Sequence, residues 1–399
     1  MSLDVVDTLR DLVRLPSVNP MGRDVSGPEY FEHQVTDYLQ ALFQRMGLPW
    51  ERQDVAPQRA NILARLDGET PPEEGGKLLV FEAHQDTVPV DGMTIEPWSG
   101  DLRDGRVWGR GSCDIKGGMS AMLAAVARLA EQRPAGLPTI VLACTVNEEH
   151  GYSGALRLAQ SWLEPGRSKL LPRTPDAVIV AEPTLLDVVV AHKGATRWKL
   201  HTTGRAGHSS RPELGENAIY QMGRVLAALE SYAKQEAPSL GEHALVGRPT
   251  LSVGIISGGI SVNTVPDRCT IEIDRRVLPG EDPLQARQTV IDYIDRHAEL
   301  SSPPVHDDPY IAAHGLSEEH NGPLAESLSA VIQQHGGTGR RTGVPYGTDA
   351  AVFAKAGAPS VVFGPGSIDQ AHTCDEWLAV EQLEKAAEIY YQFAQSGMA

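Results

Sequence analysis

Short apolar runs rich in valine, isoleucine and leucine recur along the chain, and they alternate with longer stretches of helical character. Five of these runs predict strands: Asn61–Leu66, Leu78–Ala83, Thr139–Val146, Ala177–Ala181 and Ser360–Phe363. The stretch Ser120–Gln132 between them is apolar around much of its circumference, as a helix buried against a sheet would be. This alternation predicts an α/β fold whose mixed, mainly parallel sheet is covered by helices on both faces.

The middle of the chain follows a different pattern. Three strands and two helices are expected there: Thr196–Thr202, Leu251–Ile256, Cys269–Val277, Asn217–Lys234 and Pro283–Leu300. Such a cluster is typical of a small α+β unit, and 399 residues are too many for one ordinary core. We therefore expect a discontinuous catalytic domain, residues 1–192 and 303–399, with an inserted lid or dimerisation domain, residues 193–302.

Residues that bind metals or transfer protons follow three of the predicted strands. Those just past the strand ends are His84, Asp86, Glu148, Glu149 and Glu182. The carboxyl ends of parallel strands meet at one edge of a sheet, where open α/β folds bind their ligands. Asp114, in the Gly-rich loop GRGSCDIKGG, and His372, in GPGSIDQAHTCDEW, could complete the set.

These residue types together indicate a metal site. A lone Asp or Glu at a strand end is usually a turn or surface residue, but so many acids and histidines at one predicted edge favour ligands. Imidazole and carboxylate without thiolate suit zinc, with cobalt or manganese as substitutes. Two imidazoles and three carboxylates exceed what one tetrahedral ion needs, whereas a pair of ions bridged by a carboxylate would use them all.

Charge and apolar content exclude several classes of partner. The formal net charge of −17 at pH 7 disfavours nucleic acid, whose phosphates would be repelled. No run of about 18 apolar residues occurs, so we expect no membrane span. The first twenty residues are typical of an amphipathic helix and lack the basic start of a signal peptide. Four cysteines without a C-x-x-C pair indicate reduced thiols, and we expect a cytoplasmic protein.

Five motifs in combination resemble a known enzyme family. They are H-x-D at His84, the D-[IM]-K-G-G loop at Asp114, the paired glutamates, A-E-P at Glu182 and the late A-H at His372. Over nearly the whole chain, this resembles the dizinc family of acetylornithine deacetylase, succinyl-diaminopimelate desuccinylase, aminoacylase and the glutamate-releasing carboxypeptidase. The resemblance implies two zinc ions per subunit, a bridging Asp114, and a cis peptide between Asp114 and Ile115.

The resemblance also assigns the remaining ligands and the catalytic base. It implies that His84 and Glu182 hold one zinc, and that Glu149 and His372 hold the other. Glu148 matches the family's general base. Adjacent residues of a regular strand point to opposite faces, so Glu148 and Glu149 need an irregular backbone to share one site.

Further residues are expected to position ligands and substrate. Asp86 would accept the second N–H of the His84 imidazole and fix its tautomer. His208, in GRAGHSSRP, matches the family's donor to the developing oxyanion. Three residues are expected to contact substrate: Asn263, Arg276 and Thr348. Asn263 and Arg276 match positions that bind the substrate carboxylate, for which a planar guanidinium is suited, although the neighbouring Arg275 could equally serve.

The expected function is hydrolysis of the amide bond in a small N-acyl amino acid. The segments GPGSIDQAHTCDEW and DRRVLPG look most like acetylornithine deacetylase, and a desuccinylase-like activity is also compatible. A dizinc carboxypeptidase or dipeptidase is the first alternative. A non-catalytic metal-binding scaffold is the second, although the base and every ligand are present. We expect a homodimer formed through the inserted domain, and neither nucleic acid nor membrane as partner.

Overall fold

The computed structural model describes residues 2–396 and divides them into two units. Of these residues, unit 1 comprises 2–190, 318–342 and 348–396, and unit 2 comprises 191–317 and 343–347. The insertion extends past Ser302, where the sequence analysis ended it. Strands β14 (Val305–His306) and β15 (Ile311–Ala313) both pair with β9 (Gly194–Thr203), and this pairing places residues 303–317 in unit 2.

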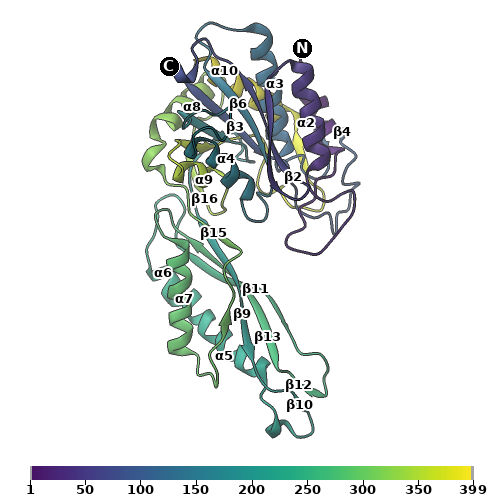
Figure 1. Ribbon diagram of the computed structural model, residues 1–399, viewed down its shortest axis with the longest axis vertical. Helices are drawn as coiled ribbons and strands as arrows, with labels where there is room; N and C mark the ends of the chain where they lie inside the picture. The colour runs from purple at the N-terminus through teal and green to yellow at the C-terminus, as the bar shows by residue number, and fades with distance from the viewer. Residues whose placement is uncertain (1, 397–399) are drawn as a thin grey trace. The chain divides into compact units, whose positions relative to one another are not determined.

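A mixed sheet of eight strands forms the centre of unit 1 (Figure 1). In spatial order the strands are β1 (Trp50–Ala56), β2 (Arg59–Leu66), β6 (Thr139–Thr145), β3 (Leu78–His84), β7 (Ala177–Val180), β17 (Ser360–Val362), β8 (Val188–His192) and β16 (Arg341–Val344). The four central strands, β6, β3, β7 and β17, run parallel. Strands β1 and β2 are antiparallel additions on one side, and β8 is antiparallel to β17 on the other. The predicted α/β sheet is confirmed.

Helices cover both faces of this sheet (Figure 1). One face carries α1 (Val5–Val13), α2 (His33–Met46), α3 (Lys116–Gln132), α8 (Gly322–Gln334) and α10 (Val380–Ser396); the other carries α4 (Ser153–Leu163) and α9 (Ala350–Lys355). Every residue of β3 is consequently buried. A continuous apolar run, and not an alternating one, is what a strand covered on both sides requires.

The remaining elements of unit 1 are short. A three-stranded sheet consists of β4 (Asp101–Arg103), β5 (Arg106–Trp108) and β18 (Trp377–Ala379). Short 3₁₀ turns occur at Pro72–Glu74 and Glu318–His320. Across residues 2–396, none of the helices combines the length and the apolar character needed to cross a bilayer.

Unit 2 is an open α+β layer. Its sheet has the order β11 (Thr250–Gly258), β13 (Arg268–Val277), β9, β14, and the helices α5 (Ala218–Ser231) and α7 (Pro283–His297) pack on it. The burial of β13 alternates residue by residue because only one face is covered. A separate ribbon pairs β10 (Gly207–His208) with β12 (Thr264–Val265). A 3₁₀ turn lies at Pro212–Leu214, and α5 continues through a π-helical segment, Tyr232–Glu236, into the short helix α6 (Ala237–Ser239).

Candidate metal centre

Three parallel strands bring their chemically active residues to one edge of the sheet in unit 1. His84 is the last residue of β3, Glu148 and Glu149 follow β6 at Thr145, and Glu182 follows β7. His84 and Thr145 are direct register partners, so the ends of β3 and β6 lie at the same level. Ligands of open α/β folds bind at this edge because the loops that follow parallel strands converge there.

Five side chains form two overlapping groups that could each hold a metal ion. The first group is His84, Asp114 and Glu182, and the second is Asp114, Glu149 and His372. Within each group the ligand atoms lie within 4.8 Å of one another. Asp114 belongs to both groups: its Oδ1 lies 3.2 Å from His84 Nε2, and its Oδ2 lies 3.3 Å from His372 Nε2. A carboxylate with one oxygen toward each imidazole is placed to bridge two ions.

Two loops deliver Asp114 and His372. Asp114 ends the Gly-rich loop that leads into α3, and its peptide bond to Ile115 is cis, as the resemblance implied. His372 follows the loop Gly364-Pro365-Gly366 and has a positive φ of 62°. Gly366 has a φ of 94°, and a Cβ there would lie 2.5 Å from the Cys113 sulfur, so only glycine fits this position.

The site concentrates carboxylates in a buried environment. Burial raises the pKa of Glu182 well above its usual range, and the Asp114 carboxylate adds to this effect. Burial and Asp114 likewise raise the pKa of Glu149. Burial alone would lower the pKa of His372, but hydrogen bonds to Asp114 and Glu149 raise it to about 11. The imidazoles thus provide positive charge that the carboxylates require.

The residues present fit a pair of divalent metal ions. Glu149 Oε1 is buried without a hydrogen-bond partner, although a buried carboxylate oxygen normally has one. His372 Nε2 lies 3.3 Å from the other oxygen, Glu149 Oε2. Nitrogen and oxygen donors without thiolate are the ligands that zinc, cobalt and manganese accept in proteins.

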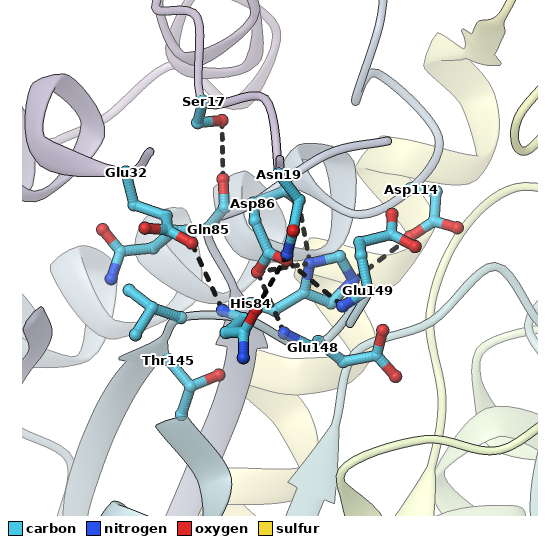
Figure 2. Close-up of polar contacts among 12 residues, drawn as sticks. Ser17, Asn19, Glu32, His84, Gln85, Asp86, Asp114, Thr145, Glu148 and Glu149 are labelled. Atoms are coloured by element: carbon cyan, nitrogen blue, oxygen red, sulfur yellow. Dashed lines mark hydrogen bonds and ion pairs between the residues drawn. The ribbon is translucent and has the colours of Figure 1, made fainter. Parts of the chain in front are cut away.

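The turn after β6 explains how two adjacent glutamates can serve one site. Asn147 has a left-handed φ of 64°, which breaks the strand geometry just before Glu148 and Glu149. Both backbone N–H groups then donate to the Asp86 carboxylate: Glu148 N to Oδ1 and Glu149 N to Oδ2, each at 3.1 Å (Figure 2). The irregular backbone required by the sequence is therefore present, and Asp86 stabilises it.

The atom of Asp86 that lies nearest His84 Nδ1 is its backbone carbonyl oxygen. His84 Nδ1 lies 3.0 Å from the backbone carbonyl of Asp86 and 3.7 Å from its carboxylate. The chain turns just after β3 and brings this carbonyl under the ring, while the carboxylate is occupied by the two glutamate amides and by Asn19 Nδ2 at 2.8 Å. A backbone carbonyl can fix the imidazole tautomer as a carboxylate does.

A polar network that the sequence analysis missed holds Asn147. Its side-chain oxygen accepts from Asn19 Nδ2 at 3.0 Å and from Arg59, and its backbone N–H donates to Glu32 at 3.3 Å. Arg59 also pairs with Glu32 at 3.0 Å. Burial, with the nearby Asp86 charge, raises the pKa of Glu32 to about 7. Asn19, Glu32 and Arg59 come from segments without a recognisable motif, so only the fold shows that they contact Asn147.

A second missed cluster lies behind His84. The Glu82 carboxyl accepts from the Thr145 hydroxyl at 2.5 Å, and the same hydroxyl lies 3.2 Å from Asp349. Burial raises the pKa of Asp349 to about 7. Thr348, expected to contact substrate, is 2% exposed, and its hydroxyl accepts the backbone N–H of Ala350 at the start of α9. Its contact with substrate stays a prediction.

Three predicted residues lie in unit 2, and they do not form one cluster there. His208 and Asn263 are neighbours, because the backbone N–H of Ser209 donates to the Asn263 carbonyl at 2.9 Å. His208 Nδ1 accepts the backbone N–H of Ser210 at 3.2 Å, so in the neutral ring the proton lies on Nε2. Strand β13 begins at Arg268, and Arg276 lies near its other end. At roughly 3.3 Å per residue, the two arginines are about 26 Å apart along the strand.

The structure separates the roles of the two neighbouring arginines. Arg275 is fully buried, and its guanidinium pairs with Glu281 at 2.6 Å. Arg276 is a quarter exposed and lies 3.0 Å from Asp274, which is also partly exposed. A ligand can therefore reach the Arg276 side chain, whereas the Arg275 side chain is buried and already paired with Glu281.

Comparison with known proteins agrees with this geometry. Residues 80–396 match peptidase family M20/M25/M40. Acetylornithine deacetylase of Myxococcus xanthus is 31% identical over 362 residues, which is 88% of this chain and 89% of the relative. Acetylornithine deacetylase of Vibrio cholerae serotype O1 is 32% identical over 372 residues, covering 91% and 90%.

Solved structures share the fold. An M20 family metallo-carboxypeptidase from Sulfolobus solfataricus superposes with a TM-score of 0.77 at 18% identity, covering 99% of both chains. A tripeptidase from Staphylococcus aureus gives a TM-score of 0.76 at 20% identity, covering 98% of this chain and 97% of the other. From the family match and the curated relatives, we conclude that the chain belongs to peptidase family M20/M25/M40 and is a metal-dependent amidohydrolase.

Proposed function

We propose that this protein removes the acyl group from a small N-acyl amino acid, with two zinc ions bound per subunit. His84 and Glu182 would hold one ion, Glu149 and His372 the other, and Asp114 both. The overlap of the two ligand groups at Asp114 is the observation that carries this proposal. Relatives named acetylornithine deacetylase, at 31–32% identity over most of the chain, favour deacylation over peptide cleavage.

The chemistry divides between the metals and the protein. When bound, two metal ions polarise the amide carbonyl and make water acidic enough to attack at neutral pH. The Glu148 carboxylate would take the proton of that water and pass it to the leaving nitrogen. Burial raises the pKa of Glu148 well above its usual range, and the Glu182 carboxylate adds to this effect. Asp86 holds the turn that carries this carboxylate.

Residues of unit 2 would supply recognition and charge stabilisation. Arg276, which a ligand can reach, would bind the substrate carboxylate through its planar guanidinium, with Asn263 as a further donor. His208 would donate from Nε2 to the oxyanion that develops on the attacked carbonyl. The tautomer set by Ser210 is the one this role requires.

A substrate panel tests the proposal. Metal-free protein would be loaded with zinc or cobalt and assayed against N-acetyl and N-succinyl amino acids, with the corresponding dipeptides in parallel. We expect hydrolysis of one class of N-acyl amino acid at a kcat/KM at least tenfold above that of any dipeptide. Preferential cleavage of dipeptides would overturn the deacylase assignment and favour a dipeptidase or carboxypeptidase.

The surface of unit 2 supports association into a homodimer. We define the β11 patch as the exposed apolar side chains on and beside the edge strand β11: Ile219, Tyr220, Ile255, Ile256, Ile260 and Val262. Ile260 is 91% exposed and Val262 is fully exposed. Part of the patch lines a hollow of about 820 Å³. Unpaired edge strands and contiguous apolar patches mark association surfaces, and two-fold dimers are the commonest oligomer.

We further propose that His208 serves the metal site of the second subunit. Unit 2 begins at Ala191, and β9 starts opposite Val277, so the chain enters at the Arg276 end of the sheet. His208 lies beyond the opposite end of that sheet. Two residues that act on one substrate from opposite ends of a sheet are more easily supplied by two subunits than by one.

Mixing two inactive variants tests this arrangement. His208→Ala and Glu148→Gln subunits would be dissociated, mixed in equal amounts and reassociated. In half of the dimers, the subunit that keeps Glu148 receives an intact His208 from its partner, so activity should return to ~25% of wild type. A mixture that stays inactive, while wild type treated in the same way recovers, would place His208 in its own subunit's site.

A cytoplasmic location remains part of the proposal. All four cysteines are free thiols, and three of them are buried: Cys113, Cys144 and Cys269. Disulfides are rare where thiols are kept reduced. Fractionation of cells that produce the untagged protein would test the location.

A further inference from the structure

A buried ion pair outside the ligand set connects the loops that carry the candidate ligands. Arg110 and Glu376 lie 2.6 Å apart, and their side chains are 3% and 1% exposed. They are separated by 266 residues in sequence. Glu376 lies four residues after His372, and Arg110 lies four residues before Asp114. The pair therefore joins the bases of both loops.

The Glu376 carboxylate also binds the backbone of the Asp114 loop. Its Oε1 accepts the N–H groups of Cys113 at 2.9 Å and Asp114 at 3.1 Å, and its Oε2 accepts that of Gly111 at 3.1 Å. The Glu376 backbone carbonyl accepts from Gly109 at 3.0 Å. The loop contains no helix or strand that could bind these N–H groups, so one distant side chain fixes its path.

Arg110 extends the connection to two further segments. Its second terminal nitrogen donates to the backbone carbonyl of Pro89, in the segment after β3, at 3.2 Å. It also donates at 3.2 Å to the carbonyl of Thr373, the residue after His372. The pair thus contacts the segment that follows His84, the loop that leads into Asp114 and the segment that follows His372.

We propose that Glu376, together with Arg110, is a positioning residue that sets the separation of Asp114 from His372 and thereby the metal affinity of the site. The inference rests on the proposed ligand set. His372 is half exposed, so packing alone constrains it weakly. The hydrogen bonds of the pair instead fix the backbone that leads into Asp114 and the backbone that follows His372. Groups that orient ligands without touching the metal commonly change metal affinity by about 10–100-fold.

Cobalt titration of metal-free protein tests the inference. Glu376→Gln keeps the size of the side chain but replaces one accepting oxygen with an NH₂ group. In either orientation this NH₂ group faces N–H donors. We expect at least a tenfold weaker binding of Co²⁺ by equilibrium dialysis, and an altered visible spectrum because the coordination geometry changes. Arg110→Lys keeps the charge and some contacts, and it should weaken binding to a smaller extent.

Glu281→Gln is the matched control. Glu281 also pairs with a buried arginine, Arg275, and also accepts a backbone N–H, that of Leu278 at 3.0 Å. Both residues are far in sequence from the candidate ligands, and unit 2 contains none of those ligands. It should bind Co²⁺ as the wild type does. Circular dichroism and thermal unfolding of each metal-free variant would establish that it is folded.

The outcomes separate the inference from the proposed function. Wild-type protein that binds no Co²⁺ would overturn the ligand set itself. Wild-type protein that binds two ions, with folded Glu376→Gln or folded Arg110→Lys binding them equally tightly and with the same spectrum, would overturn the positioning role. Equal weakening by Glu281→Gln would also overturn it, because the effect would then be general loss of stability.

Discussion

The two units bury different kinds of side chain. Within residues 2–396, the buried acidic side chains all lie in unit 1: Glu32, Glu82, Asp86, Asp114, Glu182, Asp187, Asp349 and Glu376. Unit 2 buries polar groups as well, among them His192, His201 and Arg275, but its acids lie at the surface or partly exposed. Its most exposed apolar side chains are in the β11 patch.

This difference reflects two physical tasks. Buried carboxylates destabilise a fold unless cations or hydrogen bonds compensate them, so their concentration at one sheet edge indicates a site that a dication completes. Exposed isoleucine and valine side chains contribute little to the stability of a single subunit, and they gain free energy when a second surface covers them. Unit 1 therefore carries the candidate metal centre, and unit 2 carries the surface for which we propose association.

The largest expected effect comes from Glu148 in unit 1. Glu148→Gln should lower kcat by about 10²–10⁴-fold, because general-base catalysis is lost, while about two metals per chain remain bound. Activity on the preferred N-acyl amino acid and metal content by atomic emission would be measured on the same sample. Loss of one metal with retained activity in cobalt would reverse the roles of Glu148 and Glu149.

The two units should respond to pH in opposite directions when metal-free. Burial raises the pKa of Glu32 in unit 1 to about 7, so its contribution to stability is present below about 4.5 and is lost as pH rises to about 7. A rise of this size corresponds to roughly 3 kcal/mol. Burial lowers the pKa of His306 in unit 2 to about 4, so its contribution is present above about 6.5 and is lost as pH falls to about 4.

Amide hydrogen exchange resolves the two units and would measure this difference. Between pH 5 and pH 8, after correction for intrinsic exchange rates, protection should decrease in unit 1 and increase in unit 2. Glu32→Gln should reduce the pH response of unit 1, in which other buried groups such as Asp349 also titrate, and leave that of unit 2 unchanged. Parallel trends in both units, or an unchanged slope in Glu32→Gln, would contradict the assignment.

Arg276 should give a smaller effect that depends on the substrate. Arg276→Lys keeps the charge but loses the planar pair of donors, so kcat/KM should fall about tenfold for substrates with a free α-carboxylate. The corresponding α-amides should be affected much less. An equal loss for both would mean that Arg276 has a structural role, for example through its contact with Asp274.

The smallest effect on the fold should come from the β11 patch. Ile260→Ser combined with Val262→Ser changes only side chains that are almost fully exposed, so the free energy of unfolding of the single subunit should change by less than about 0.5 kcal/mol. The proposed homodimer should nevertheless dissociate into single subunits, and sedimentation at micromolar concentration would measure this. A variant that remains dimeric would exclude these two residues from the interface.

Much of the fold of both units is readable from local pattern. The predicted strand Leu78–Ala83 and the predicted helix Pro283–Leu300 each differ from β3 and α7 by at most three residues at one end. Long apolar runs and capped helices depend on neighbours in sequence, which is why such patterns succeed. The end of the insertion could not be predicted, because β14 and β15 are two and three residues long and form only by pairing with β9.

The sequence by itself determined which residue types follow which strands, and hence the donor set and its place at the carboxyl edge of the sheet. Only the tertiary structure decided that Asp114 presents one oxygen to each imidazole. The structure also assigned the Asp86 carboxylate to backbone amides and brought Arg110 against Glu376. The physical reason is that these contacts join segments up to 266 residues apart. A charged residue in a loop has the same local sequence pattern whether it remains in solvent or pairs in the interior.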